Sequence, residues 1–305
     1  MTIVITGANS AVGQAILRAG LAQQPPPTLI ACVRSARAMA GLPSLPPEQV
    51  VQIAYDQPAT LDAALAGATA VIHLAGTLVE RAGSTYETAN VQTARAVAQA
   101  AERCGVAKIV LISAIGADPG SRNRYLKTKG EAEAVTRAVT CAHTVLRVPL
   151  LLGPGTEGTA ALQRHLAKPT VSLPGGGRNR QQPLHVDDLA RAALAAADPA
   201  TARNTTLELV GPVSLPDREI LERAARLLGR EIQVRSVPIL PLRLLLGLQR
   251  MVSGPGFSPD VLDVITADTN LDPGPAAGEL GITLTGLDEM IRASVASSGQ
   301  RTTGA

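Results

Sequence analysis

The first half of the chain alternates short apolar runs with longer segments of helical periodicity. The apolar runs are rich in Val, Ile, Leu and Thr and predict strands at residues 2–6, 28–34, 50–54, 69–75, 107–113 and 144–148. The segments between them predict helices near residues 11–22, 59–66, 86–104 and 124–140. Continuous apolar strands separated by amphipathic helices are typical of parallel sheets covered on both faces. Because crossovers are right-handed, the pattern favours a doubly wound α/β fold.

The pattern changes after Pro149. Loops rich in glycine and proline lie at residues 153–158 and 174–180. Further elements are predicted as helices at 186–197 and 217–229, strands near 205–210 and at 231–236, and two more helices with a frayed tail from Ser253 onward. We expect residues 1–149 to form one domain. Residues 150–305 are expected to form a smaller substrate-binding cap, intertwined with that domain, over the carboxyl edge of the sheet.

A leucine-rich apolar stretch runs from Val237 to Val252 within this cap. Its charged residues are Arg243 and Arg250, so it lacks the basic face that helices on membrane surfaces usually have. We interpret the stretch as a lid or wall of a largely apolar substrate pocket, with the glycine loops closing over the ligand. A membrane-surface role is the weaker alternative.

Composition and charge narrow the classes of function. The 305 residues are 46% hydrophobic, so the chain can bury a sizeable core, although it has no Trp, one Phe and three Tyr. Lys and Arg are scattered, and the formal net charge is only +3. A nucleic-acid binder usually carries a basic stripe or stacking aromatic residues, so we expect no nucleic-acid partner. We expect a small-molecule substrate, acted on by a monomer or homodimer.

Metal and membrane chemistry are not indicated. The cysteines Cys32, Cys104 and Cys141 are far apart, and no group of His, Cys and Asp has the spacing of metal ligands, so no metal is expected. No apolar run reaches the ~18 residues needed to span a bilayer, so we expect no stable membrane insertion. The first apolar run is too short for a signal sequence and has no basic run before it, which favours a cytoplasmic protein.

The turn after the first predicted strand has the features of a phosphate-binding site. Gly7 permits a tight turn there, and Gly13 lets the following helix pack close to the strand. The backbone N–H groups and the helix N-terminus would then face a pyrophosphate, although an ordinary strand–helix turn is the alternative. We expect this Rossmann-type turn to bind a dinucleotide through Gly7, Asn9, Ser10, Ala11, Val12 and Gly13.

The residues at the end of the second predicted strand indicate which dinucleotide, NAD(H) or NADP(H), the protein binds. Sheets that bind NAD often place an acidic residue there to hold the ribose hydroxyls. This strand ends with Val33 and Arg34, and Arg37 follows one helical turn later. A guanidinium can clamp a 2′-phosphate through paired hydrogen bonds, so we expect NADP(H) rather than NAD(H). A solvent-exposed Arg34 without a ligand is the alternative.

Several stretches carry a family resemblance. They are TGANSAVG at 6–13, Tyr55–Asp56, VIHLAG at 71–76, LISAIGADPGSRNRYLKTKGEAE at 111–133, VLRVPLLLGPG at 145–155 and QPLHVDDLARA at 182–192. The resemblance that they carry extends over most of the chain. The pattern resembles the extended and atypical branch of the short-chain dehydrogenase/reductase superfamily, notably the NmrA-like proteins and the dehydrogenase-like accessory subunit of respiratory complex I. The family's usual turn is TGxxGxxG, and here Ser10 replaces its middle glycine.

Tyr125 and Lys129 form a Y-x-x-x-K motif, whose spacing places both side chains on one face of a helix. A phenol has an ordinary pKa of ~10, and an ammonium one turn away favours the phenolate, which helps proton exchange with a carbonyl or alcohol. The resemblance implies that this is the catalytic pair and that the lysine also binds the nicotinamide ribose. A Tyr–Lys pair on an exposed helix face is the alternative.

The remaining site residues follow from the resemblance. Many extended members carry two serines at the end of the fifth strand, and the second binds the substrate oxygen; here the pair is Ser113-Ala114, so Ser113 is the candidate substitute. Asn90 resembles the helix asparagine that supports the lysine through water, or is a polar first-turn residue. Further cofactor contacts are implied for Asp56, Ala75, Gly76, Ser113, Tyr125, Lys129, Pro149 and Leu150. His73 and His185 are expected to be structural.

The leading hypothesis is an NAD(P)-dependent oxidoreductase, with hydride transfer between the nicotinamide and a carbonyl or alcohol of a small, apolar substrate. Epimerase or dehydratase chemistry would use the same pair of residues. The competing hypothesis is a non-catalytic NADP-binding sensor or structural subunit, because fold alone does not settle function. The Tyr125–Lys129 pair favours the enzyme, whereas Ser10 and Ala114 favour the binder.

Overall fold

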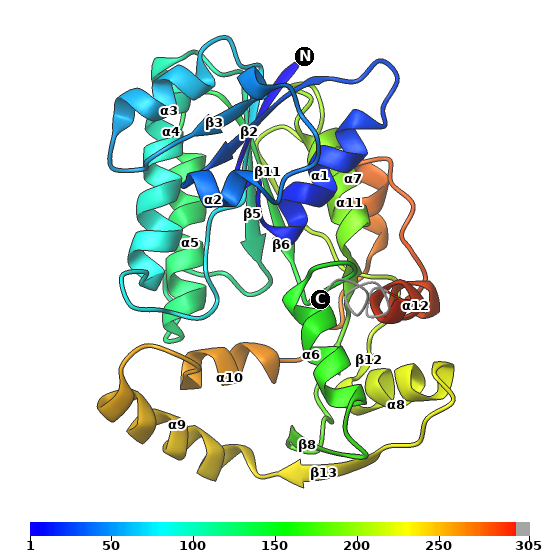
Figure 1. Cartoon of the computed structure of the whole chain (residues 1–305). Helices are drawn as coiled ribbons and strands as arrows, with labels where there is room; N and C mark the ends of the chain where they lie inside the picture. Colours follow the sequence, from blue (N-terminus) through cyan, green and yellow to red (C-terminus); the bar gives the residue numbers. More distant parts are fainter. Residues whose placement is uncertain (297–305) are drawn as a thin grey trace.

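A seven-stranded sheet lies at the centre of the computed structural model, which describes residues 1–296 (Figure 1). Its strands are β1 (Thr2–Thr6), β2 (Thr28–Val33), β3 (Val50–Gln52), β4 (Ala70–His73), β5 (Lys108–Ala114), β6 (Ala142–Val148) and β11 (Thr205–Glu208). Their order is β11-β6-β5-β4-β1-β2-β3, and every neighbouring pair is parallel. The predicted doubly wound α/β fold is confirmed.

The strand order reverses between β1 and β4, where the chain first builds outward to β3 and then crosses back. In open α/β sheets, ligands bind outside the carboxyl ends of the strands at this switch point. Register places the ends of β1 and β4 level, because Thr6 pairs with His73. The candidate site is therefore expected around these two strand ends.

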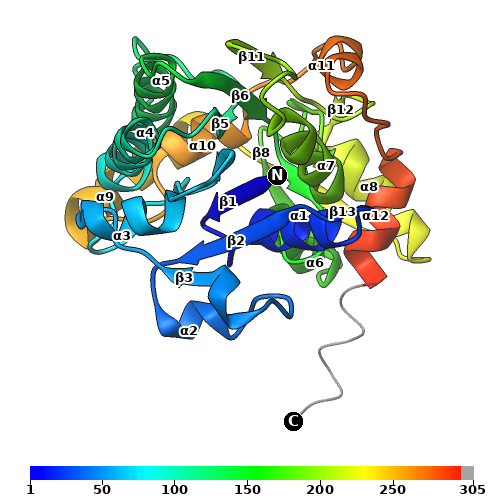
Figure 2. The ribbon, with the colours of Figure 1, turned by 90° about the horizontal axis from the view of Figure 1, so that it is seen from above.

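Helices cover both faces of the sheet (Figure 2). One face carries α1 (Ala11–Leu21) and α7 (Val186–Ala196), and the other carries α3 (Pro58–Leu65), α4 (Thr93–Arg103) and α5 (Arg124–Arg137). Each layer has its own apolar core, built mostly from Ala, Leu, Ile and Val. Short helices α2 (Ala36–Met39) and η1 (Pro47–Gln49) lie between β2 and β3, and a π-helical turn, η2 (Glu87–Gln92), leads into α4.

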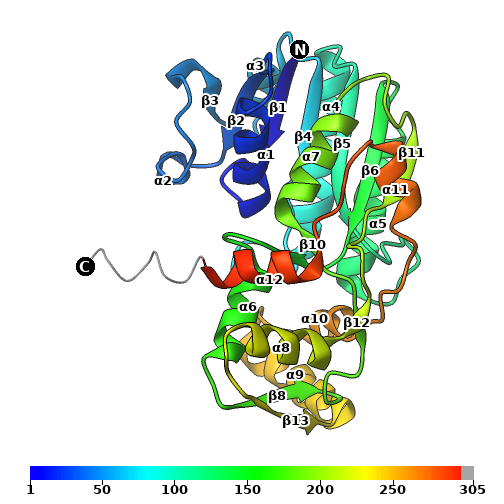
Figure 3. The ribbon, with the colours of Figure 1, turned by 90° about the vertical axis from the view of Figure 1, so that its right-hand side faces the viewer.

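The second half of the chain contributes to both parts of the molecule. Its α7 packs on α1 and its β11 pairs with β6, so both belong to the sheet layers. The other elements are β7 (Leu151–Leu152), α6 (Glu157–Leu166), β8 (Thr170–Pro174), β9 (Arg180–Gln181), β10 (Leu184–His185), β12 (Leu215–Pro216), α8 (Asp217–Leu227), β13 (Gln233–Val237), α9 (Ile239–Ser253), α10 (Pro259–Ile265), α11 (Gly274–Glu279) and α12 (Leu287–Ala296). Figures 1 and 3 show α6, α8, α9 and α10 gathered beyond the carboxyl ends of the strands.

The C-terminal part differs from the prediction in one respect. Three helices, α10, α11 and α12, follow Ser253 where two were predicted, because Pro259 and Pro273 each start a short helix that periodicity alone does not separate. The predicted frayed tail falls on residues 297–305, outside the described residues. No helix within residues 1–296 is both long and apolar enough to cross a membrane.

Candidate active site

The turn from β1 into α1 depends on two glycines. Gly7 has φ +76°, in the left-handed region that glycine adopts without strain. A Cβ on Gly7 would lie 3.4 Å from the backbone nitrogen of Ala75, and a Cβ on Gly13 would lie 2.5 Å from the carbonyl oxygen of Ala8. The turn therefore packs tightly against the segment after β4, and Gly13 has no room for a side chain.

Ser10 explains how the turn forms without the family's middle glycine. Its φ is −69°, which any residue adopts, and its Oγ accepts a hydrogen bond from the Gly13 N–H at 3.0 Å as the N-cap of α1. The Asn9 carbonyl accepts from the Gln14 side chain at 3.1 Å. Within residues 1–296, the N–H groups of Ala11 and Val12 have no acceptor, so the start of α1 presents two donors and the positive end of its dipole. This arrangement fits a phosphate group.

The second and third strands end in exposed polar side chains. Arg34 follows β2 directly, and Asp56 follows Tyr55 after β3; both are exposed, and neither forms an ion pair within the described part of the chain. The Tyr55 ring lies edge-on to His73 with 6.1 Å between the ring centroids, and burial raises the pKa of Tyr55 to about 12. Arg34 and Asp56 are therefore available to a ligand at this edge.

His73 belongs to the core, as the sequence indicated. It is 1% exposed, and its Nδ1 lies 2.7 Å from the Thr6 hydroxyl across the β1–β4 pair. Burial and the nearby Lys129 lower the pKa of His73 to about 3, so the imidazole stays neutral. Its role is to join the two strand ends at the switch point.

The segment after β4 connects the turn to the Tyr–Lys helix. Ala75 approaches Gly7, and a Cβ on Gly76 would lie 2.9 Å from Asn90 Oδ1 and 3.8 Å from Lys129 Nζ. Gly76 is exposed, so the path between these groups stays open to a ligand. Ala75 and Gly76 thus lie between the β1–α1 turn and the Tyr125–Lys129 pair.

Asn90 lies on the π-helical turn η2 and is 1% exposed. Its Oδ1 accepts from the Thr77 N–H at 3.0 Å, and its Nδ2 donates to the Thr128 hydroxyl at 3.0 Å. Single π turns are frequent at functional sites because they shift one side chain out of helical register. Asn90 therefore ties the loop after β4 to α5 through Thr128, the residue before Lys129.

Tyr125 and Lys129 lie in the first half of α5, whose N-cap is Asn123. Lys129 is 6% exposed, and its Nζ donates to the Ile112 carbonyl at 2.7 Å. Burial lowers the pKa of Lys129 to about 8. The half-buried Tyr125 ring packs against Tyr86, with 5.8 Å between the centroids.

One electrostatic expectation for this pair is not met. Burial, followed by the neighbouring Tyr86, raises the pKa of Tyr125 above its ordinary value, and Lys129 does not act to lower it. The physical reason is that Lys129 directs its ammonium at the Ile112 carbonyl. A raised pKa keeps the Tyr125 phenol protonated at neutral pH, which suits a proton donor more than a proton acceptor.

Ser113 does not have the geometry expected of a substrate donor. Its Oγ donates to Glu133 Oε1 at 2.6 Å, and Glu133 is fully buried. Burial acts to raise the pKa of Glu133, but hydrogen bonds from Arg147 and Ser113 outweigh it and hold the carboxylate ionised. The Ser113 proton is thus committed to a buried ion network, and the next residue, Ala114, has no hydroxyl.

Pro149 and Leu150 follow β6, and Leu150 is 38% exposed. The glycine loop beyond them lies beside the turn, because a Cβ on Gly155 would be 3.5 Å from the Cβ of Ala11. The start of the second half therefore flanks the N-terminus of α1. The cofactor contact that the resemblance implies for Pro149 and Leu150 stays a prediction.

A network that the sequence does not reveal lies next to Tyr125. The buried Glu80 accepts from the Tyr86 N–H at 3.0 Å, from Arg124 at 3.1 Å and from Arg250 at 2.5 Å. Arg124 also lies over the Tyr86 ring, 5.5 Å from its centroid. The network joins α9 to the Tyr125 end of α5. Glu80 and Arg250 are 170 positions apart, so no local pattern could have paired them.

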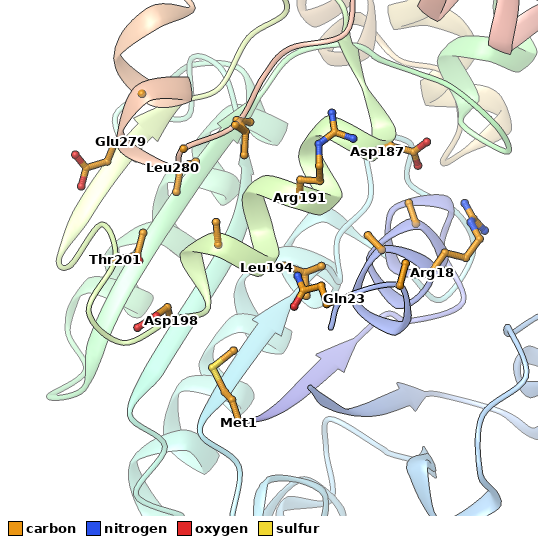
Figure 4. Close-up of a pocket in the computed structure, with 17 residues that line it drawn as sticks. Met1, Arg18, Gln23, Asp187, Arg191, Leu194, Asp198, Thr201, Glu279 and Leu280 are labelled. Atoms are coloured by element: carbon orange, nitrogen blue, oxygen red, sulfur yellow. The ribbon is translucent and has the colours of Figure 1, made fainter. Parts of the chain in front are cut away.

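A hollow of about 1050 Å³ opens elsewhere, between α1, α7 and residues 278–282 (Figure 4). Its charged lining residues include Arg18, Asp187, Arg191 and Glu279. None of the expected site residues lines it. The strand ends, not this hollow, carry the candidate site.

The model of a family described as NAD(P)H-binding matches residues 7–198, from the first glycine of the turn to the end of α7. The chain belongs to the NAD(P)H-binding family.

Curated relatives of this NAD(P)H-binding protein include a ceramide reductase of Caulobacter vibrioides, 28% identical over 181 residues, which are 59% of this chain and 57% of the relative. Another is the NADH dehydrogenase [ubiquinone] 1 alpha subcomplex subunit 9 of Arabidopsis thaliana mitochondria, 30% identical over 179 residues, 57% of this chain and 44% of the relative. The chain thus spans about half the length of these curated relatives.

Solved structures resemble the whole NAD(P)H-binding protein in fold. MoeE5 in complex with UDP-glucose and NAD gives a TM-score of 0.76 at 20% identity, covering 98% of this chain and 99% of that one. The triphenylmethane reductase of Citrobacter sp., complexed with NADP(H), gives 0.74 at 19% identity, covering 96% and 99%. These likenesses show that the chain shares the fold of both proteins.

Proposed function

We propose that the protein is an NADP(H)-dependent oxidoreductase of the extended or atypical short-chain dehydrogenase type. Its reaction would be hydride transfer involving a carbonyl or alcohol of a small apolar substrate. The observation that carries the proposal is the placement of Tyr125 and Lys129 on one face of α5, with Lys129 Nζ 3.8 Å from the Cβ position of Gly76 at the switch point. A buried ammonium and a protonated phenol beside a dinucleotide turn have no evident structural purpose.

The dinucleotide would be held along the strand ends. The proposed contacts are Gly7, Asn9, Ser10, Ala11, Val12, Gly13, Arg34, Asp56, Ala75, Gly76, Pro149 and Leu150. Ala11 and Val12 would bind the pyrophosphate through their N–H groups, and the two glycines bring the backbone close enough. When bound, the nicotinamide would supply or accept the hydride.

Arg34 supports NADP(H) over NAD(H). It is exposed directly after β2, in the position where NAD-binding sheets often carry a carboxylate. Paired hydrogen bonds from a guanidinium to a charged phosphate are worth about 1.5–3 kcal/mol, or roughly ten-fold or more in affinity. We therefore propose at least tenfold tighter binding of NADP(H).

Tyr125 would donate its phenol proton to the substrate oxygen as the carbonyl carbon receives the hydride. The raised pKa of Tyr125 keeps the phenol protonated at neutral pH, which is the form that the reduction of a carbonyl requires. Lys129, held by the Ile112 carbonyl, would bind a ribose hydroxyl of the dinucleotide. Ser113 has no part in this step, since its proton is committed to Glu133.

The decisive experiment compares Tyr125→Phe, Lys129→Ala and the control Lys127→Ala in NADPH consumption on apolar aldehydes, ketones and quinones. Removing the Tyr125 hydroxyl should lower turnover by about 10²–10⁴-fold and leave the NADPH dissociation constant nearly unchanged. Lys129→Ala should weaken both. Lys127 is half-exposed on the same helix, so its removal should change neither. Full turnover by the Tyr125→Phe protein would place the proton donor elsewhere.

A second candidate function is a non-catalytic NADP(H)-binding sensor or structural subunit. It is favoured by the absence of a hydroxyl at Ala114 together with the engagement of Ser113 by Glu133. The relative that is a subunit of NADH dehydrogenase points the same way. A protein that binds NADPH tightly but consumes none with any member of the carbonyl panel would support this function over the first.

A further inference from the structure

Tyr125 is the second residue of α5, and a residue far away in the chain completes the first turn of that helix. The N-cap, Asn123, accepts a hydrogen bond from the Leu126 N–H at 3.1 Å. The N–H of Arg124 has no acceptor within the helix, and it donates to Oδ1 of Asp260 at 2.9 Å. Asp260 lies in the first turn of α10, 136 positions further along. A carboxylate from the second half of the chain thus caps the helix that carries the phenol.

A second hydrogen bond joins α10 to the same turn. The backbone carbonyl of Asp260 accepts from Asn123 Nδ2 at 2.8 Å, so one residue of α10 binds both the N-cap and the first residue of α5. Figure 1 shows α10 beside the lower end of α5. The Asp260 carboxylate, 16% exposed, also lies at the positive end of the α5 dipole. Helix ends fray unless their free N–H groups find acceptors, so these contacts hold the backbone that carries Tyr125.

The ring of Tyr125 is supported by helix α9 through a buried carboxylate. The ring packs against Tyr86, whose N–H donates to the buried Glu80 at 3.0 Å. Glu80 in turn accepts from Arg250 of α9 at 2.5 Å. Arg250 Nη1 lies 4.0 Å from Asp260 Oδ2. The backbone and the ring of Tyr125 are therefore both connected to α9 and α10, through one group of paired charges.

Helix α9 makes this contact because its charged side faces the protein. Arg243 donates to Asp263 of α10 at 2.8 Å, and Leu246, between Arg243 and Arg250 along the chain, is 7% exposed. The predicted apolar wall of a pocket at 237–252 is wrong for the exposed residues of this helix, which face the solvent instead. They are Leu240, Leu244, Leu245, Leu248 and Val252.

We propose that Asp260 is a positioning residue that sets the place of the Tyr125 phenol through the first turn of α5. The inference rests on the proposed function, in which Tyr125 is the proton donor. A displacement of about 1 Å at a reacting group can cost about 10²-fold in rate, so turnover would respond to a small movement of this turn. Lys129 lies one turn further into α5 and is anchored on the Ile112 carbonyl, so NADPH binding would not depend on Asp260.

Asp263 provides a matched control on the same helix. It follows Asp260 by three positions and pairs with Arg243 of α9 at 2.8 Å. Within residues 1–296 it forms no hydrogen bond or ion pair with α5. Replacing either acid by alanine removes a carboxylate that lies near an arginine of α9. Only Asp260→Ala also removes a contact with the helix that carries Tyr125.

The first test compares Asp260→Ala, Asp260→Asn and Asp263→Ala in NADPH consumption, with the carbonyl compound that the wild type reduces fastest. Asp260→Ala should lower kcat by about 10²-fold and leave the NADPH dissociation constant unchanged. Asp260→Asn keeps an oxygen acceptor for the Arg124 N–H, so it should recover most of the lost turnover. Asp263→Ala should change neither quantity.

The second test does not need turnover. The chain has three tyrosines, so labelling their rings with carbon-13 gives three sets of NMR signals, and Tyr125→Phe identifies the set of Tyr125. These signals depend on the packing of the ring against Tyr86. They should shift or broaden in Asp260→Ala and stay in place in Asp260→Asn and Asp263→Ala. A wild type without turnover would remove the proposed function, and these signals would still decide whether Asp260 places the phenol.

Three results would overturn the proposal. The first is a set of Tyr125 signals that Asp260→Ala leaves unmoved. The second is an equal loss of turnover in Asp260→Ala and Asp263→Ala, which would make both acids structural. The third is a loss in Asp260→Asn as large as that in Asp260→Ala, because the acceptor for the Arg124 N–H would then not be the feature that matters.

Discussion

Replacement of Lys129 by methionine should stabilise the protein at neutral pH. Lys129 is 6% exposed, and burial lowers its pKa from 10.5 to about 8. A basic group whose pKa is lowered by folding destabilises the folded state when it is protonated. This cost is absent at pH values above the unfolded pKa, and it is complete at pH values below the folded pKa. At neutral pH the folded protein therefore bears the cost of a buried charge that methionine, of similar length, does not carry.

The magnitude follows from the two pKa values. A difference of this size corresponds to about 3 kcal/mol at pH 7, of which about 2 kcal/mol is recovered by pH 9.5 as Lys129 deprotonates. The advantage of Lys129→Met over wild type should therefore shrink by about 2 kcal/mol across this range. A gain in stability on replacing Lys129 is typical of functional sites, where a buried charge is kept although it lowers the stability of the protein.

Urea unfolding followed by circular dichroism at pH 7 and pH 9.5 measures this difference, and comparing variant with wild type removes the titration of other groups. Lys127→Met is the control, because Lys127 is half-exposed and only two positions away. Its effect on the free energy of unfolding should stay within about 0.5 kcal/mol at both pH values. An effect of Lys129→Met that does not change with pH would refute the reasoning and indicate that the ammonium is fully compensated where it lies.

Three further predictions concern individual side chains. Arg34→Ala should raise the NADPH dissociation constant at least about tenfold and leave that of NADH nearly unchanged; equal losses in calorimetric titration would remove the case for a 2′-phosphate contact. Ser10→Ala should lower the free energy of unfolding by about 1 kcal/mol through loss of the α1 cap, whereas Ser10→Gly should cost only a few tenths; chemical denaturation distinguishes them, and equal costs would argue against capping. Ser113→Ala should cost about 1–3 kcal/mol of stability through loss of its hydrogen bond to the buried, ionised Glu133, which keeps its bonds from Arg137 and Arg147. Its turnover should remain near that of wild type, and a loss of about 10² or more would instead identify Ser113 as a substrate donor.

Local pattern was sufficient for the elements of the sheet layers. The first strand, residues 2–6, and the start of the first helix at residue 11 agree with β1 and α1, because β-branched runs and a glycine turn are short-range signals. Element ends moved by a few residues, as in β4, predicted at 69–75 and observed at Ala70–His73. The doubly wound class of fold followed from the right-handed crossover rule, which needs no side-chain detail.

Residue spacing also placed the Tyr125–Lys129 pair on one helix face, since four positions make about one turn. It could not foresee what each side chain would meet there. Lys129 bonds to a carbonyl of β5, and Ser113 bonds to a carboxylate of α5. Both partners come from other elements, so the charge state of the phenol and the availability of the serine were decided by packing.

The sequence by itself determined the parallel sheet, the dinucleotide turn and the candidate pair, because each rests on periodicity or on residues close along the chain. Tertiary structure alone decided that Glu80 meets Arg250 and that the leucines of α9 face outward. A leucine-rich helix has an apolar side in either case, and its pattern does not say whether that side turns toward the protein. Here the orientation is explained by two arginines on the inner side of α9. Arg243 pairs with Asp263 and Arg250 pairs with the buried Glu80, so the leucines on the other side of the helix face the solvent.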